Sequence, residues 1–264
     1  MGEVLHTCRL VLQVLGLGPW ALGLTRDGRI PAMRRSAYEV SRLEGFSDAV
    51  FGFALTLLVV SLEVPGGTDQ LYEQMLGFIP FALMFAMVCW IWYEHNVFFR
   101  RYGLQDPWTV FLNCVLLFVV LFYVYPLKFL TLHLAGQFRG DPATNMKDVD
   151  GRLVMLLYSA GVVLIFGVFV ALHRHAWKKR AALGLDAADL MTLRYSTRGH
   201  AISTSLGLVS IAIVLVNRRW SGIAGMIYGL MGPLHAWNGY QAGKAHARLQ
   251  PTAPPLPARP EPNA

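Results

Sequence analysis

The stretch SRLEGFSDAVFGFALTLLVVSLEVP, Ser41 to Pro65, decides what kind of protein this chain forms. It opens with charged residues, places Ser47 and Asp48 at the start of an apolar run, and then carries no charge until Glu63. A run of about 20 apolar residues crosses the hydrocarbon core of a bilayer as one helix. Because an aspartate at the edge of such a helix is costly without a partner, we expect a membrane span combined with a polar site.

The composition of the whole chain agrees with this interpretation. Of its 264 residues, 55% are hydrophobic and 15% are charged, and the mean hydropathy is +0.43. These values exclude an ordinary soluble domain and favour an all-α, polytopic membrane protein. The net charge of +7 would suggest nucleic acid as a partner of a soluble protein. Here the basic residues lie in loops beside apolar spans, where they set topology and attract anionic lipid instead.

The hydropathy pattern predicts six transmembrane helices, at about residues 46–64, 75–93, 108–134, 153–172, 199–216 and 220–237. We therefore expect a basic N-terminal extension over residues 1–37, poorly ordered or lying on the membrane surface. A six-helix transmembrane domain over residues 38–240 follows, and then a disordered proline-rich tail over residues 241–264. If the segment before the first span is cytoplasmic, that side holds 16 lysines and arginines and the opposite side holds 5. This bias predicts that both termini are cytoplasmic.

The first span has two different faces when it is drawn as a helix. The side chains of Phe53, Thr56, Leu57 and Val60 lie within about 100° of one another, and Ser47 and Asp48 point elsewhere. The stripe either forms a functional surface or packs against other helices and lipid in the ordinary way.

Polar residues of the next two spans fall at the same depth as Asp48. Glu94 and His95 close the second span, with Trp92 close by, and Asn113 begins the third. We expect one buried network in which Asp48 accepts hydrogen bonds from arginine, histidine, asparagine or indole donors. A simpler alternative is that Ser47 or Asp48 only caps the first helix.

The segment Arg42-Leu-Glu-Gly-Phe46-Ser47-Asp48, followed by an apolar helix that carries Thr56, resembles the Arg-x-x-x-Phe-Ser-Asp signature of the transmembrane protein 175 family. These proteins are endolysosomal potassium channels and their prokaryotic relatives. The later spans are similar to the family as well, in Trp92-x-x-His95, Phe98-Phe99-Arg100, Asn113-x-x-Leu116 and Tyr125-Pro126. The resemblance covers about residues 38 to 238 and indicates a prokaryotic-type member with a single motif.

The resemblance implies a potassium-permeable, modestly selective cation leak channel, built as a homotetramer in the plasma membrane. The first helix would line a hydrophobically constricted pore, with the constriction at Phe53, Leu57 and Val60 further along, and Thr56 alongside. The family usually has isoleucine or leucine where this chain has Phe53. A helix-packing network would comprise Arg42, Phe46, Ser47, Asp48, Trp92, His95 and Asn113. The resemblance implies no cofactor other than the permeating potassium ion, and no nucleic-acid partner.

Other functions have weaker support in the sequence. A proton-coupled transporter could use Asp48, Glu94 and His95 as titrating groups, but the sequence shows no inverted repeat. We expect no enzyme, because no nucleophile is paired with a base. We expect no metal site, because the histidines lack ligand spacing. The basic run at residues 173–180 is typical of a juxtamembrane anchor, with a lipid-regulated patch as the alternative.

The glycines of the sixth span favour close helix approach, and Pro233 predicts a kink there. These glycines recur at short spacings, at Gly222, Gly225, Gly229 and Gly232.

Overall fold

The computed structural model describes residues 41–60, 67, 78–139 and 150–249, and the structural statements below concern these residues. The predicted N-terminal extension, and the tail beyond residue 249, lie outside them. The long helices are α2 (Arg42–Val60), α4 (Phe78–Tyr102), α5 (Pro107–Arg139), α6 (Gly151–Lys178) and α7 (Ala187–Val216). The short segments η5 (Arg218–Trp220), α8 (Ser221–Met226) and η6 (Ile227–Leu230) then lead into α9 (Met231–Leu249). The described chain is thus helical, as the sequence predicts.

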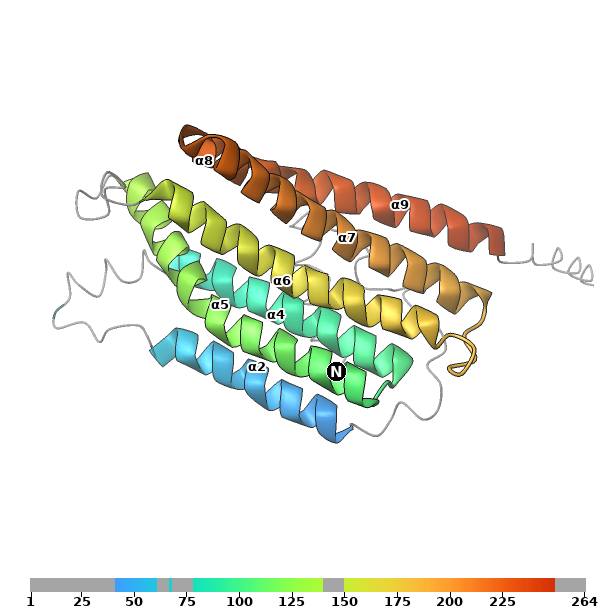
Figure 1. Ribbon diagram of the computed structural model, residues 1–264. Helices are drawn as coiled ribbons and strands as arrows, with labels where there is room; N and C mark the ends of the chain where they lie inside the picture. The colour runs from blue at the N-terminus through green and yellow to red at the C-terminus, as the bar shows by residue number, and fades with distance from the viewer. Residues whose placement is uncertain (1–40, 61–66, 68–77, 140–149, 250–264) are drawn as a thin grey trace, which may run out of the picture.

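The helices lie side by side in one elongated bundle (Figure 1). Helices α2, α4 and α5 contact one another, α6 packs between α5 and α7, and α9 packs mainly against α7. Four helical segments are long and apolar enough to cross a membrane: Phe81–Tyr102, Pro107–Phe129, Gly151–Lys178 and Ala187–Val216. They correspond to the second to fifth predicted spans. The first span continues beyond the described part of α2, and the sixth is divided among η5, α8, η6 and α9, so these two stay predictions.

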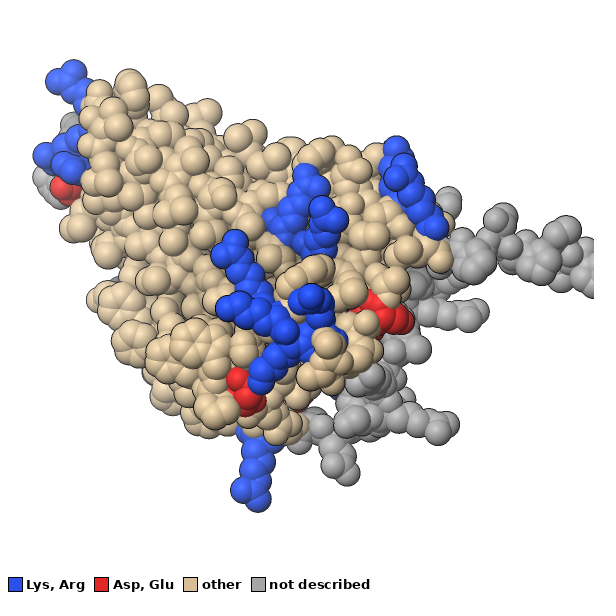
Figure 2. All heavy atoms as spheres, turned by 45° about the vertical axis from the view of Figure 1, so that its right-hand side comes forward, with Lys and Arg blue, Asp and Glu red and all other residues tan. Residues whose placement is uncertain are grey.

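One end of the bundle is strongly basic. Figure 1 shows that α2, α5 and α7 begin there and that α4, α6 and α9 end there. Figure 2 brings this end forward and shows many lysine and arginine side chains with few acidic ones. We call it the basic end; its described cations are Arg42, Arg100, Arg101, Arg174, Lys178, Lys179, Arg180, Arg194, Arg198, Lys244 and Arg248. The alternation of helix ends agrees with the distribution of basic residues in the sequence.

Helix α2 begins with a reciprocal cap. The hydroxyl of Ser41 accepts the backbone N–H of Glu44 at 3.2 Å and donates to the Glu44 carboxylate at 2.8 Å. Serine at the N-cap with glutamate three residues later is a common way to begin a helix. The interpretation of Ser47 or Asp48 as the cap of this helix is therefore wrong.

The close helix contacts lie elsewhere than the glycine spacing predicts. A side chain added at Gly222, Gly229 or Gly232 would meet nothing within 4 Å, and one at Gly225 would meet only Met155 at 3.8 Å. The narrow contacts are instead at Gly161 on α6 and Gly207 on α7. The sixth span also differs from a single kinked helix, because Pro233 stands in the first turn of α9, after the 3-10 segment η6.

The predicted boundary of the tail at residue 241 is too early. Helix α9 continues to Leu249. Its last residues include three alanines, a lysine and an arginine, which favour helix, and the next proline in the sequence is Pro251.

The turn between α4 and α5 is held to the end of α6 by Asp106. Its carboxylate accepts from Thr109 at 2.8 Å and from His175 at 3.0 Å, and it lies 3.2 Å from the Lys179 ammonium. Partial burial alone would raise the pKa of Asp106, but the hydrogen bonds from Thr109, His175 and Lys179 outweigh it and hold the pKa below its ordinary value. The ionised carboxylate therefore stabilises this corner of the bundle.

We expect Asp106→Asn to lower the free energy of unfolding by about 1 kcal/mol at neutral pH. Since the folded-state pKa is depressed, the contribution is present above the unfolded value and is lost as the pH falls through the folded value. Thermal unfolding in detergent should therefore show a difference between variant and wild type that closes only below about pH 4. If the difference in unfolding temperature stayed constant from neutral pH to below about pH 4, the charge of Asp106 would contribute nothing to stability.

Candidate functional site

The two faces of α2 have different surroundings. Ser47, Phe51, Ala54 and Leu58 are each at most 2% exposed. Their spacing of three or four residues puts them on one side of the helix, which packs against α4 and α5. This face anchors α2 to the rest of the subunit.

A buried chain of hydrogen bonds runs through this anchored face from α4 to α2. His95 donates from Nε2 to the Asn113 side-chain oxygen at 2.7 Å, and the Asn113 amide donates to the Ser47 hydroxyl at 2.9 Å. Ser47 in turn donates to the backbone oxygen of Leu43 at 2.8 Å. The order of donors follows because the Asn113 oxygen can only accept, which places the histidine proton on Nε2. All three side chains are at most 1% exposed, so the chain fixes how three helices pack.

Asp48 meets one of the donors that the sequence predicts for it, the indole of Trp92. Its carboxylate accepts from the Trp92 indole at 2.7 Å, whereas His95 and Asn113 are linked to Ser47. The expectation of a single network centred on Asp48 is wrong, because the hydroxyl of Ser47 rather than the carboxylate points between α4 and α5. Arg42 and Phe46 lie outside both sets of contacts, and Phe46 is 56% exposed.

The opposite face of α2 is exposed. It carries the small residues Gly45, Ala49 and Gly52, and beside them Phe53 and Leu57, which are 58% and 44% exposed. Thr56 is also exposed, and its hydroxyl donates to the Gly52 backbone oxygen at 2.9 Å. Only the lone pairs of that hydroxyl are left to face outward. The backbone of Val60 ends α2, but its side chain lies outside the described residues.

The chain is similar to known potassium channels. The family model of the endosomal/lysosomal potassium channel TMEM175 matches residues 42–123. A potassium channel of Marivirga tractuosa is 36% identical over 222 residues, which cover 79% of this chain and 90% of that protein. This chain belongs to the TMEM175 family. Membership in a family of channels also confirms the expectation that the protein is not an enzyme.

A further relative and two solved structures agree. A potassium channel of Streptomyces collinus is 25% identical over 197 residues, covering 72% of this chain and 92% of that protein. A crystal structure of a variant of the potassium channel MtTMEM175 superimposes with a TM-score of 0.69 at 34% identity, covering 81% of this chain and 97% of that one. A TMEM175 homologue from Chamaesiphon minutus gives a TM-score of 0.51 at 23% identity, over 76% and 96% of the two chains. This last likeness concerns the fold alone.

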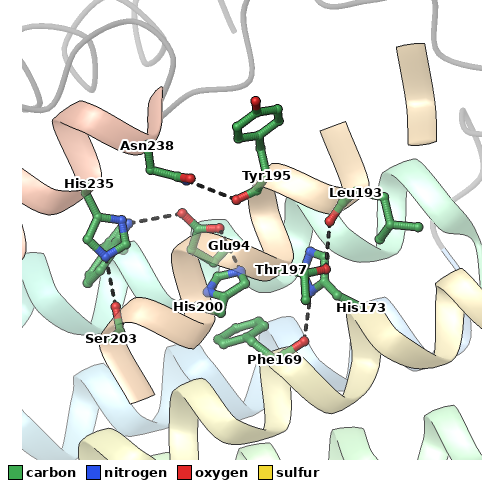
Figure 3. A network of polar contacts seen from close by, with 11 residues as sticks. Glu94, Phe169, His173, Leu193, Tyr195, Thr197, His200, Ser203, His235 and Asn238 are labelled. Carbon is green, nitrogen blue, oxygen red and sulfur yellow. Dashed lines mark hydrogen bonds and ion pairs between the residues drawn. The ribbon is translucent and has the colours of Figure 1, made fainter. Parts of the chain in front are cut away.

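A second polar cluster lies away from the family motif (Figure 3). On α4, Glu94 accepts from the Trp90 indole at 3.2 Å and lies 3.7 Å from Nε2 of His200 on α7. The His200 ring stacks on Phe169 with centroids 4.9 Å apart. His173 on α6 bonds to the backbone oxygen of Phe169 at 2.8 Å. The sequence analysis missed this cluster, and no spacing along the chain indicates it.

The same region ties α9 to α7. His235 bonds to the Ser203 hydroxyl at 2.9 Å, and the Asn238 amide donates to the backbone oxygen of Tyr195 at 3.0 Å. Among the described residues of α9, Asn238 alone is buried. Polar contacts rather than apolar burial therefore position this helix.

The structure separates the three residues that a proton-coupled transporter would require. Glu94 points to His200, His95 points to Asn113, and Asp48 meets Trp92. The grouping of Asp48, Glu94 and His95 is thus a wrong prediction, because adjacent residues on α4 point about 100° apart. Within the described ranges, no group of three or more histidine, cysteine, aspartate or glutamate side chains could hold a metal ion.

Removing the Asp48 carboxylate should have a modest effect in this geometry. We expect Asp48→Ala to cost about 1 kcal/mol, since it leaves the partly exposed indole of Trp92 without its acceptor. Asp48→Asn keeps an oxygen at the same position and serves as the matched control. Thermal unfolding of both variants in detergent measures the difference. A loss of roughly 3 kcal/mol for Asp48→Ala, as for two buried groups left unsatisfied, would restore Asp48 to the centre of the network.

Proposed function

We propose that the protein is a potassium-permeable, modestly selective leak channel in which α2 from each of four copies lines a common pore. The observation that carries the proposal is the division of α2 into an anchored face and an exposed one. An apolar helix whose outward face presents Gly45, Ala49 and Gly52 suits close approach to other helices. Because one α2 cannot enclose a pore, several copies around an axis are required. The relatives' description as potassium channels supports the same function.

The expected pore has a hydrophobic constriction and no carbonyl filter. Phe53 and Leu57 would provide the narrow part, with Val60 beyond them and Thr56 alongside. The Thr56 hydroxyl already donates to Gly52, so it can offer a cation only oxygen lone pairs. A pore of this kind selects by diameter and dewetting, which supports modest rather than strong discrimination between potassium and sodium.

The proposal extends to the placement of the chain. With the basic end in the cytoplasm, both termini are cytoplasmic and the protein is multi-pass in the plasma membrane. Because α9 continues to Leu249, the six-helix channel domain then runs from about residue 38 to the end of that helix, preceded by the basic extension. No cofactor is needed, and the permeant species is the potassium ion.

The test is flux from liposomes that are loaded with potassium and diluted into sodium, together with the mass of the purified complex. Wild-type protein should form tetramers and give potassium-driven flux. Phe53→Ala should leave the tetramer intact and raise the flux several-fold, or change the preference for potassium, since it removes a ring from each side of the constriction. Phe118→Ala on α5, also exposed at 69%, is the matched control.

The outcomes separate the parts of the proposal. Unchanged flux from Phe53→Ala would remove α2 from the pore. An equal effect of Phe118→Ala would mean that the loss of any exposed ring perturbs the channel. A well-formed tetramer without flux would contradict the proposed activity itself.

A further inference from the structure

The basic end carries more positive charge on α7 and α9 than the fold uses. Helix α9 contains no acidic residue, and α7 contains only Asp189, in its first turn. Among the residues described, no carboxylate forms an ion pair with a lysine or arginine of these two helices. Arg194, Arg198, Lys244 and Arg248 are all exposed, and none of them pairs with a carboxylate of the described residues.

Aromatic rings organise these cations. The guanidinium of Arg198 on α7 lies 4.4 Å from the centroid of the Trp237 ring on α9. Along α9, the ammonium of Lys244 lies 4.8 Å from the centroid of the Tyr240 ring. A guanidinium stacked on an aromatic face keeps its N–H donors in one plane, where they can bind a phosphate. We call these residues the α7–α9 patch: Arg194, Arg198, Trp237, Tyr240, Lys244 and Arg248.

The patch spans two helices whose relative position is fixed. The Asn238 amide bonds to the Tyr195 backbone oxygen at 3.0 Å, and Thr192 bonds to His246 at 3.1 Å. Arg194 and Arg198 are one turn apart on α7, and Trp237, Tyr240, Lys244 and Arg248 follow one side of α9 at spacings of three, four and four. The cations are consequently held around one location rather than scattered over a mobile surface.

An apolar strip of exposed side chains continues from the patch toward the opposite end of the bundle (Figure 1). On α7, Val209 and Val216 share the face of Arg198 and are 48% and 77% exposed. In the segments before α9, Leu230 and Met226 are 53% and 78% exposed. Tryptophan and tyrosine commonly mark the level where lipid headgroups meet acyl chains.

We propose that the α7–α9 patch binds the phosphate of an anionic phospholipid, whose acyl chains lie along this apolar strip. Arg194, Arg198, Lys244 and Arg248 supply the positive charge, and Trp237 and Tyr240 lie at the level of the glycerol backbone. The apolar strip distinguishes a lipid from a soluble phosphate, which would use the cations alone. The bound lipid contacts both helices and so holds α9 against α7. Such support matters because Asn238 alone is buried among the described residues of α9.

The test is a titration of purified protein, in uncharged detergent, with dioleoylphosphatidylglycerol, followed by the thermal unfolding temperature. Dioleoylphosphatidylcholine and inorganic phosphate are titrated in parallel. We expect phosphatidylglycerol to raise the unfolding temperature in a saturable way, with little effect of the other two. Arg194→Gln combined with Arg198→Gln should raise the half-saturating concentration about thirty-fold. Each cation near anionic lipid strengthens binding about five- to sixfold, and the double variant loses two of them.

The control is Arg218→Gln combined with Arg219→Gln, which removes two exposed cations from the opposite end of the bundle. It should retain the wild-type response to phosphatidylglycerol. Equal losses in both double variants would show that net charge alone attracts the lipid, and an unchanged response of the first would exclude the patch. A shift of the same size with inorganic phosphate would exclude a lipid as the ligand. Each readout is binding, so none depends on ion flux.

Discussion

Gly161→Ala is expected to cause the largest loss of stability of any conservative substitution considered for this protein. An added methyl group on Gly161 would lie 1.9 Å from Cε2 of Tyr123, far inside van der Waals contact. The ring cannot easily retreat, because Tyr123 is 4% exposed and its hydroxyl donates to the backbone oxygen of Tyr158. Helices α5 and α6 would have to separate, at a cost of about 3 kcal/mol or more. The measurement is the thermal unfolding temperature and the yield of monodisperse protein in detergent.

Two further variants make this prediction specific. Gly167→Ala lies on the same helix with nothing within 4 Å of the added methyl group, and it should leave stability unchanged or slightly raised. Tyr123→Leu combined with Gly161→Ala should recover part of the loss, because the ring that causes the clash is gone. If Gly161→Ala were as stable as wild type, α5 and α6 would not approach as closely as described.

Asn113→Leu is expected to have the second largest effect. The substitution removes the acceptor of the His95 N–H and the donor to the Ser47 hydroxyl, and all three side chains are at most 1% exposed. Each buried group left unsatisfied costs about 1–3 kcal/mol, so we expect a loss of roughly 3 kcal/mol in the free energy of unfolding. Ser47 keeps its bond to the Leu43 backbone, which limits its share of the loss. Thermal unfolding in detergent measures the effect.

The neighbouring residue provides the control for Asn113. Cys114 is exposed, and Cys114→Leu should change stability by no more than about 0.5 kcal/mol. Combining Asn113→Leu with His95→Phe should recover part of the loss, because replacing both partners by apolar groups leaves no orphaned donor. The rings of Phe51 and Phe99, 5.5 Å and 4.5 Å from that of His95, already surround the site. An Asn113→Leu variant with wild-type stability would mean that the hydrogen-bond chain does not hold the helices together.

Much of the architecture was predictable from the sequence because it depends on local chemistry. Apolar runs of membrane length predicted a polytopic all-α chain, and the Phe46-Ser47-Asp48 motif indicated the family. The division of α2 into two faces was predictable too, since the rotation of 100° per residue is a property of the helix itself.

Several of the predictions that failed depend on where another helix lies. Ser47 and Asp48 are adjacent in the sequence and both carry side-chain oxygen, so either residue could have accepted a hydrogen bond from Asn113. The choice of Ser47 follows from how α2 is rotated against α5. In the same way, Glu94 meets His200 because α7 passes that side of α4, although the two residues are far apart in the chain.

The amino-acid sequence by itself determined that the chain crosses a membrane as helices, that it carries the TMEM175 motif, and that Ser47 and Phe53 point away from each other. Only the tertiary structure decided that Ser47 rather than Asp48 joins Asn113, that Gly161 rather than the glycines of the sixth span is the tight contact, and that Glu94 belongs to a separate cluster. The physical reason is that periodicity fixes directions within one helix, whereas partners depend on the rotation and separation of helices that the packing of the whole bundle sets.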